Sequence, residues 1–148
     1  MNPRLSWNEY FMRMAHLAAK RSTCFRRAVG AVAVIDNHVI ATGYNGVPAG
    51  LEHCTSDTCI RLQQKIPSGT RHEMCRGLHA EQNLVIQAAL GTQSIKGATV
   101  YCTTFPCSIC AKILINCDIK KIYYTCGYDD PLAKELFSEA GIITESLD

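Results

Sequence analysis

Two short clusters of metal-ligating side chains, 28 residues apart, constrain this chain more than any other feature. The first is His79-Ala80-Glu81, and the second is Pro106-Cys107-Ser108-Ile109-Cys110. Cys107 and Cys110 are three positions apart, so at the first turn of a helix their sulfurs lie on the same side. Helix N-termini carry free N–H groups and a positive dipole end, which favour thiolates. A fold that uses these residues must bring the starts of two helices together.

His79, Cys107 and Cys110 supply three of the four bonds that a tetrahedral zinc ion needs. Three protein ligands leave the fourth position for water, which is typical of a catalytic rather than a structural zinc. Two thiolates and a neutral imidazole cancel the charge of Zn²⁺, so a bound water can ionise near pH ~7 instead of ~15.7. Glu81 lies two residues beyond a ligand, where it can take the proton of that water. The spacing predicts a catalytic zinc site with Glu81 as its general acid–base.

The nine cysteines of this 148-residue chain point the same way. An odd number, without an apolar leader segment, argues against a disulfide scaffold and favours metal ligation with some thiols in the core. Cys102, Cys117 and Cys126 fall in strand or helix-end patterns and are expected in the core. No run approaches the roughly 18 apolar residues of a membrane span, so we expect a cytoplasmic protein with no membrane partner.

Composition is that of one folded domain, 47% hydrophobic and 19% charged, and we expect residues 1–148 to form a single catalytic unit. The net charge of +2 is too small to require nucleic acid as a partner. Six Lys or Arg residues lie within the first 27 positions. Arg26, near the end of that run, is a candidate for contacting a phosphate; the alternative is a solvated helix face.

Hydrophobic periodicity predicts helices that alternate with strands after an initial hairpin. The predicted elements are helix 7–20, strands 29–36 and 39–42, helix 78–90, strand 98–103, helix 107–117, strand 121–125, and a helix from Asp130-Pro131 to Gly141. This order predicts an α/β fold with one sheet and helices on both faces. The long stretch 44–77 has weak periodicity, and loops of that length need something to order them.

His-x-Glu followed by Pro-Cys-x-x-Cys resembles the signature of the zinc-dependent nucleobase deaminases. Most of the chain is similar to the deoxycytidylate (dCMP) deaminases of bacteria and phages. The blocks that carry this likeness are Ser22-Thr23-Cys24, Val29-Gly30-Ala31-Val32, Gly43-Tyr44-Asn45-Gly46-Val47-Pro48-Ala49-Gly50, His79-Ala80-Glu81-Gln82-Asn83 and the Pro106 motif. The resemblance implies a three-layer α/β/α fold of the cytidine deaminase-like superfamily, with a central mixed sheet.

The resemblance also implies the reaction, hydrolysis of dCMP to dUMP and ammonia, which supplies dUMP for thymidylate synthesis. Zinc-bound hydroxide would attack C4 of cytosine, and Glu81 would pass its proton to ring N3 and then to the leaving amine. The residues implied for the substrate are Ala80 and Thr103 at the base edge, Asn45 at the sugar hydroxyl, and Tyr128 and Arg26 at the 5′-phosphate. A turn or core role is the alternative for Asn45 and Tyr128.

Regulation is implied by the same likeness. Gly43, Tyr44, Asn45, Gly46 and Gly50 would belong to a site for a nucleotide with Mg²⁺, where dCTP activates and dTTP inhibits a homohexamer. The glycines suit such a site because they let the backbone approach phosphate oxygens closely. The alternative is an ordinary loop.

Some relatives hold a second, structural zinc, and five donors lie upstream of His79 in this chain. The preferred set is Cys24, Cys54, His72 and Cys75, with Cys59 as the substitute for Cys24. A closed site takes four ligands, so one donor is in excess. The alternative is that these are free buried thiols.

Two other functions share parts of the pattern. A deaminase of tRNA adenosine or DNA cytidine has the same zinc motif but needs a basic groove and aromatic stacking around a flipped base. A zinc-stabilised binding module without turnover would have no use for Glu81 beside an open metal position. The weak net charge argues against the first, and Glu81 argues against the second.

Overall fold

A mixed five-stranded sheet with the order β2-β1-β3-β4-β5 forms the middle of the molecule. The strands are β1 (Gly30–Ile35), β2 (His38–Tyr44), β3 (Thr99–Thr104), β4 (Lys121–Cys126) and β5 (Ile143–Ser146). β1 pairs antiparallel with both β2 and β3, whereas β3, β4 and β5 run parallel to one another. The structure is a computed structural model that describes residues 1–127 and 130–148.

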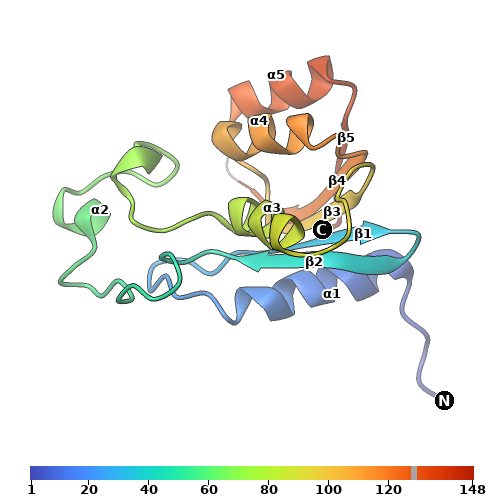
Figure 1. The fold of residues 1–148 in the computed structure, drawn as a ribbon, viewed down its shortest axis with the longest axis horizontal. Coiled ribbons are helices and arrows are strands. Elements are labelled where there is room, and N and C mark those ends of the chain that lie inside the picture. Colours follow the sequence, from blue (N-terminus) through green and yellow to red (C-terminus); the bar gives the residue numbers. More distant parts are fainter. Residues whose placement is uncertain (128–129) are drawn as a thin grey trace.

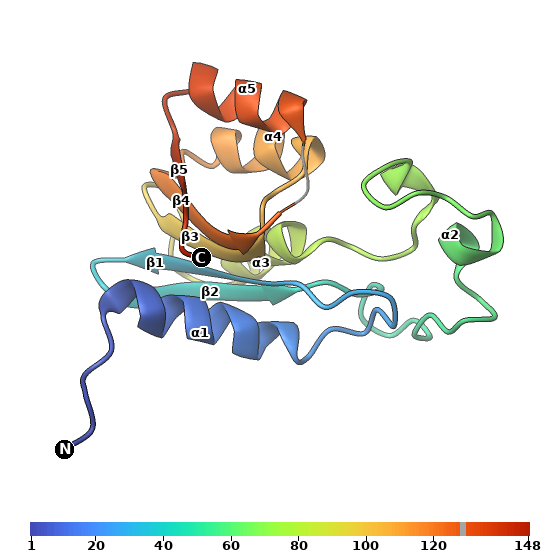
Figure 2. The ribbon, with the colours of Figure 1, turned by 180° about the vertical axis from the view of Figure 1, so that it is seen from behind.

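Helices cover both faces of this sheet, as Figures 1 and 2 show. The long helices are α1 (Trp7–Ala19) on one face, and α3 (Ala80–Leu90), α4 (Ser108–Asn116) and α5 (Pro131–Glu139) on the other. The predicted three-layer α/β/α arrangement with a mixed sheet is therefore confirmed. The capping box that begins α1 is formed as well, with Ser6 and Glu9 each accepting from the backbone of the other.

Two apolar cores result, one on each side of the sheet. The larger lies under α3, α4 and α5 and contains Leu84, Leu114, Ile122 and Phe137. The smaller lies under α1 and contains Phe11 and other apolar side chains of α1, β1 and β3. β1 contributes to both, which explains why its sequence is almost entirely apolar.

Two glycines let helices approach the sheet on opposite faces. A Cβ at Gly30 would lie 2.0 Å from the carbonyl oxygen of Ala15 in α1, and a Cβ at Gly43 would lie 2.3 Å from that of Ala80 in α3. The prediction that the second strand ends at Thr42 was therefore too short. Gly43 and Tyr44 belong to β2, because α3 uses the missing side chain of Gly43 to pack on the strand.

The chain between β2 and α3 extends beyond the end of the sheet (Figures 1 and 2). It contains a short helix, α2 (Ile60–Gln63), and a 3₁₀ turn, η1 (His72–Met74), neither of which periodicity predicted. Its two ends are joined by a pair of backbone hydrogen bonds between Gly46 and Leu78, at 3.1 and 2.7 Å. The long segment is thus closed at its base, beside the start of α3.

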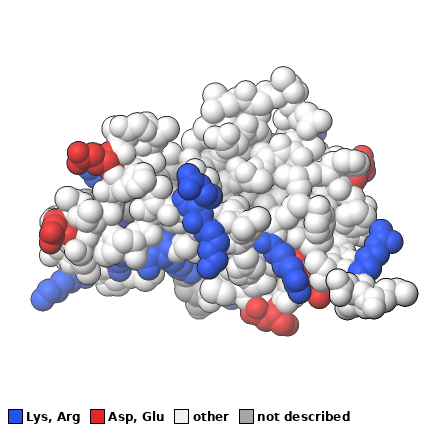
Figure 3. Space-filling model, turned by 90° about the horizontal axis from the view of Figure 1, so that it is seen from below, with Lys and Arg blue, Asp and Glu red and all other residues white. Residues whose placement is uncertain are grey.

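Positive charge does not form a continuous groove on the face that carries α1. Figure 3 shows Lys and Arg side chains there in separate groups, with uncharged and acidic surface between them. In the described part of the chain, no helix combines the length and apolar character needed to cross a membrane.

Candidate active site

His79, Cys107 and Cys110 meet between the starts of α3 and α4. Nδ1 of His79 lies 3.4 Å from Sγ of Cys107 and 3.3 Å from Sγ of Cys110. Zinc bonds of ordinary length at tetrahedral angles would separate a nitrogen and a sulfur ligand by about 3.6 Å. Within residues 1–127 and 130–148, no other group of three or more such side chains lies this close together. The three residues therefore fit a zinc ion.

Backbone contacts hold these ligands at the two helix starts. His79 is the N-cap of α3, and its N–H donates to Oε1 of Gln82 at 2.7 Å. Cys107 is the N-cap of α4, whose first free N–H, that of Ser108, donates to Oδ2 of Asp130 at 2.9 Å. The other oxygen of Asp130 accepts from Ala133 at the start of α5, so one carboxylate caps two helices.

The three ligand side chains shift one another's pKa values through their mutual hydrogen bonds and charges. The hydrogen bond from Cys110, helped by one from His79, lowers the pKa of Cys107 to about 4 against the effect of burial. The same shared proton raises the pKa of Cys110, and the Cys107 thiolate raises the pKa of His79. The lowered pKa of Cys107 suits a thiolate ligand, and metal binding would release the protons held by the three side chains.

Glu81 lies in the first turn of α3, directly beside this group. Its side chain is 5% exposed, and burial raises its pKa. Cys102 of β3, predicted as a core residue, is fully buried, and burial together with the charge of nearby Glu81 raises the pKa of its thiol. The carboxyl group is thus held in place at the position where the sequence predicted an acid–base.

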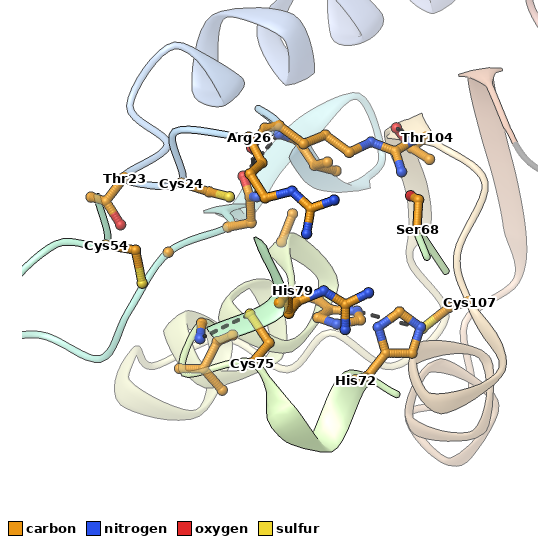
Figure 4. A pocket seen from close by; sticks show the side chains of 18 of the residues that line it. Thr23, Cys24, Arg26, Cys54, Ser68, His72, Cys75, His79, Thr104 and Cys107 are labelled. Carbon is orange, nitrogen blue, oxygen red and sulfur yellow. Dashed lines mark hydrogen bonds between the residues drawn. The ribbon is translucent and has the colours of Figure 1, made fainter. Parts of the chain in front are cut away.

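A cavity of about 350 Å³ opens over these residues (Figure 4). It is lined by the start of α3, the end of β3, the segment that follows α1, and the long segment between β2 and α3. His79, Glu81 and Cys107 form part of its wall. The space has the size of a small-molecule site.

Comparison with known proteins agrees with this geometry. Residues 5–126 match the family model described as the cytidine and deoxycytidylate deaminase zinc-binding region. The chain belongs to this deaminase family. It is 41% identical to the deoxycytidylate deaminase of Schizosaccharomyces pombe over 96% of its own length, but spans only 45% of that protein.

Two other relatives match over nearly their whole length. The deoxycytidylate deaminase of Mycobacterium phage D29 is 38% identical over 82% of this chain and 95% of its own. A crystal structure of dCMP deaminase from the cyanophage S-TIM5, in complex with dCMP and dUMP, covers 99% of this chain and 100% of its own, with a TM-score of 0.80 and 28% identity. The fold and the zinc motif are therefore those of the deaminase family.

Asn45, which the resemblance assigned to the sugar hydroxyl, lines the cavity of this deaminase fold. Its side chain is already engaged with the protein: Oδ1 accepts from the N–H of Val29 and Nδ2 donates to the carbonyl of Arg27, each at 2.9 Å. The side chain of Asn45 therefore joins the end of β2 to the segment after α1 through two hydrogen bonds. One amide hydrogen remains for a ligand.

The other substrate residues fall into three groups. Ala80 and Arg26 line the cavity, as expected. Thr103 does not line it, because its side chain accepts from the N–H of Gly30 within the sheet and its carbonyl accepts from Thr125. Thr104, the next residue, lines the cavity instead. Tyr128 lies outside the described residues.

The five donors proposed for a second zinc also line this cavity, but the structure does not gather them at ligating distances. Burial raises the pKa of Cys54, and the nearby thiols of Cys75, Cys59 and Cys24 add to that effect. His72 lies elsewhere: its ring centroid is 4.7 Å from that of His79. Figure 4 shows Cys24 and Cys54 on the side of the cavity away from His72 and Cys107.

The nucleotide-site residues are split between the strand and the loop. Gly43 and Tyr44 lie in β2, and Asn45 and Gly46 line the active-site cavity. Gly50 lies in the loop with a φ of +87° and open space around it.

Sequence reasoning missed several cavity residues, among them Ser68, Thr104 and, as the one buried cation of the described residues, Arg61 of α2. This arginine is buried, and it donates to the carbonyls of Pro67 and Arg71. A helix of four residues is too short to show periodicity, and an arginine in a polar segment gives no local sign that it will be buried.

Proposed function

We propose that this chain hydrolyses the 4-amino group of dCMP, giving dUMP and ammonia. The observation that carries the proposal is the His79–Cys107–Cys110 group with buried Glu81 beside it, at the wall of a cavity of about 350 Å³. The phage D29 relative supports the substrate by its name, and the cyanophage structure by the nucleotides it contains. The product dUMP would feed the synthesis of thymidylate.

His79, Cys107 and Cys110 would hold the zinc ion, which supplies a Lewis acid that lowers the pKa of water. The carboxylate of Glu81 accepts a proton from the attacking water. Glu81 then donates that proton to N3 of the cytosine ring, and it moves a second proton to the departing amino group. One water is consumed for each ammonia released. A raised pKa suits Glu81 to this work, because the group must both accept and return protons near neutral pH.

The test is a comparison of ammonia release from four substrates: dCMP, cytidine, dCTP and a cytosine-containing oligonucleotide. We expect dCMP to react fastest. Faster turnover of the oligonucleotide would replace our proposal with a nucleic-acid deaminase. Protein whose zinc has been removed by a chelator is the control, and activity should return when zinc is added back.

A second zinc is part of the proposal, with a ligand set that differs in one residue from the one the sequence favoured. We propose that the ligands are Cys24, Cys54, Cys59 and Cys75. The other three thiols lie close enough to Cys54 to raise its pKa, whereas the ring of His72 lies against that of His79. Closure of a Cys₄ site would require a small inward movement of these side chains. Such a site would order the long segment that lacks a regular core of its own.

Metal analysis decides between the two ligand sets. The wild-type chain is expected to bind about two zinc ions per subunit, and Cys59→Ser about one. His72→Ala is expected to keep both ions. The opposite pattern would restore the set that includes His72, and one ion in the wild type would remove the second site.

Regulation and assembly rest on the family resemblance. We propose a cytoplasmic homohexamer that dCTP with Mg²⁺ activates and dTTP inhibits, with the nucleotide near the loop that ends at Gly50. Exposed apolar side chains on α3, including Leu90 and Ile86, support self-association. Light scattering measures the assembly, and dCMP saturation curves with and without dCTP and Mg²⁺ measure the regulation. Hyperbolic curves that neither nucleotide changes would contradict the regulatory part.

A further inference from the structure

Among the described residues, the buried charged side chains are Glu81, 5% exposed, and Arg61, 8% exposed. Both line the same cavity, although Glu81 comes from α3 and Arg61 comes from α2 in the long segment. The proposed chemistry uses Glu81 and leaves Arg61 without a role. Burying a charge costs free energy unless it is paired, so the partner of Arg61 needs to be identified.

The protein gives Arg61 only neutral partners. Nη1 donates to the carbonyl of Arg71 at 2.9 Å, and Nη2 donates to the carbonyl of Pro67 at 3.0 Å. None of the ion pairs within residues 1–127 and 130–148 includes Arg61. A guanidinium group has five N–H donors, so these two bonds leave donors free. Among the described residues, no fully buried side-chain nitrogen lacks a hydrogen-bond partner, so the remaining donors of Arg61 keep some access to solvent or ligand.

The rest of the lining favours an anion. Arg26 and Arg27, from the segment after α1, line the cavity as well, and Glu81 is the one carboxylate among the described lining residues. Ser68, which follows the Pro67 carbonyl that Arg61 holds, adds a hydroxyl group to the lining (Figure 4). Arginine suits a phosphate because its planar donors can bind two oxygens at once.

We infer that Arg61 binds the phosphate monoester of the substrate and so selects a nucleotide over a nucleoside. The inference rests on the proposed function, since it concerns the substrate of the same cavity. The bonds to Pro67 and Arg71 fix the guanidinium in one orientation before the ligand arrives, which lowers the entropy lost on binding. The dianionic phosphate then supplies the counter-charge that the protein omits, and the hydroxyl of Ser68 is a further donor on the lining of the same cavity.

The experiment compares kcat/KM for dCMP with kcat/KM for deoxycytidine, which lacks only the phosphate. For Arg61→Met we expect the dCMP value to fall by roughly 10- to 100-fold, the cost of losing a charged hydrogen bond, while the deoxycytidine value changes less than about threefold. Arg76→Met is the matched control, because Arg76 belongs to the same long segment but is exposed and does not line the cavity. Its preference for dCMP should equal that of the wild type.

Arg61→Lys tests the same idea if Arg61→Met does not fold. Lysine keeps the charge and loses the planar fork, so we expect an intermediate preference for dCMP and weaker inhibition by inorganic phosphate. Equal losses on both substrates in either variant would show that Arg61 only braces the loop, and would overturn the inference. A wild-type chain that does not prefer dCMP would instead overturn the proposed function, so the two failures are distinguishable.

Discussion

Glu81 combines two properties that rarely coincide in a carboxyl group. It is buried, which raises its pKa, and it lies within one helical turn of a metal-ligating imidazole. The bond from the N–H of His79 to Gln82 fixes the start of the same helix, and the packing of α3 on the sheet buries Glu81. Glu81 and the ligand His79 therefore keep their relation to one another whenever α3 is in place, and α4 adds Cys107 and Cys110.

Glu81→Gln keeps the shape of the side chain but removes its ability to carry a proton. We expect kcat to fall by at least ~10²–10⁴-fold, the usual contribution of a general acid–base, while the zinc of the His79 site is retained. Ammonia release and metal analysis on the same sample measure both. Glu73→Gln, which alters an exposed carboxylate, is the control. Retained activity, or loss of zinc together with activity, would contradict the role.

For single residues, the sequence alone identified those whose role only a few side-chain types can perform. Zinc accepts few ligand types, so His79, Cys107 and Cys110 could be chosen from their spacing. It did not identify Arg61, because an arginine becomes buried only through the path of the surrounding loop. The position of His72 depends on the same loop: its ring lies against that of His79, a contact that its spacing from the cysteines does not indicate.

Among the elements, α3 depends on the absence of a side chain beneath it. In Gly43→Ala, the new Cβ would meet the backbone of Ala80 and Leu84 at 2.3 and 2.5 Å, so the helix must shift. We expect a loss of about 1–3 kcal/mol in the free energy of unfolding, together with weaker zinc binding. Urea unfolding and a zinc-chelator competition measure the two effects.

Gly91→Ala at the other end of the same helix is the control for that variant. Its Cβ would have contacts of 3.4 Å or more, so it should leave zinc affinity unchanged. A Gly43→Ala variant that is as stable as the wild type would show that α3 can slide on β2 without cost.

Asp130 joins two elements through one carboxylate, since it caps both α4 and α5. Removing a cap costs about 0.5–2 kcal/mol, so Asp130→Ala should lower the free energy of unfolding by about 2 kcal/mol. Asp130→Asn keeps one acceptor and should lose about half as much. Denaturant unfolding measures both variants, and equal stability of all three proteins would refute the double cap.

Elements with strong local signals were predicted, and those without were not. The capping box before α1 and the Asp130-Pro131 start of α5 are formed by residues close together in the sequence, so they could be predicted from it. β5 has only four residues, and it forms by pairing with β4 along the edge of the sheet. Helix α2 is equally short, and its position depends on the path of the surrounding loop, which the local sequence does not predict.

Across the whole molecule, Tyr101 ties the sheet to the helix on its far face. Its hydroxyl donates to Oδ1 of Asn8 at 2.7 Å, its ring packs on Phe11 and Tyr123, and burial raises its pKa to about 12. The folded state therefore keeps the phenol protonated after the unfolded chain has lost that proton, near pH ~10. The resulting stability is complete below pH ~10 and is lost as the pH rises toward ~12.

Tyr101→Phe should flatten this dependence. Urea unfolding measured in steps from about pH 9 to about pH 12 is expected to show a shallower fall in stability for the variant than for the wild type. Parallel curves would show that other groups control the alkaline transition.

The paired backbone bonds between Gly46 and Leu78 have a consequence for how such a protein can evolve. The two ends of the long segment that contains Arg61, Ser68 and the thiols lie next to each other, at Gly46 and Leu78. Lengthening a loop whose ends are already joined adds little entropic cost, so insertions and deletions there leave β2 and α3 in register. Ligand preference can thus diversify among descendants while the machinery for breaking the carbon–nitrogen bond is inherited intact.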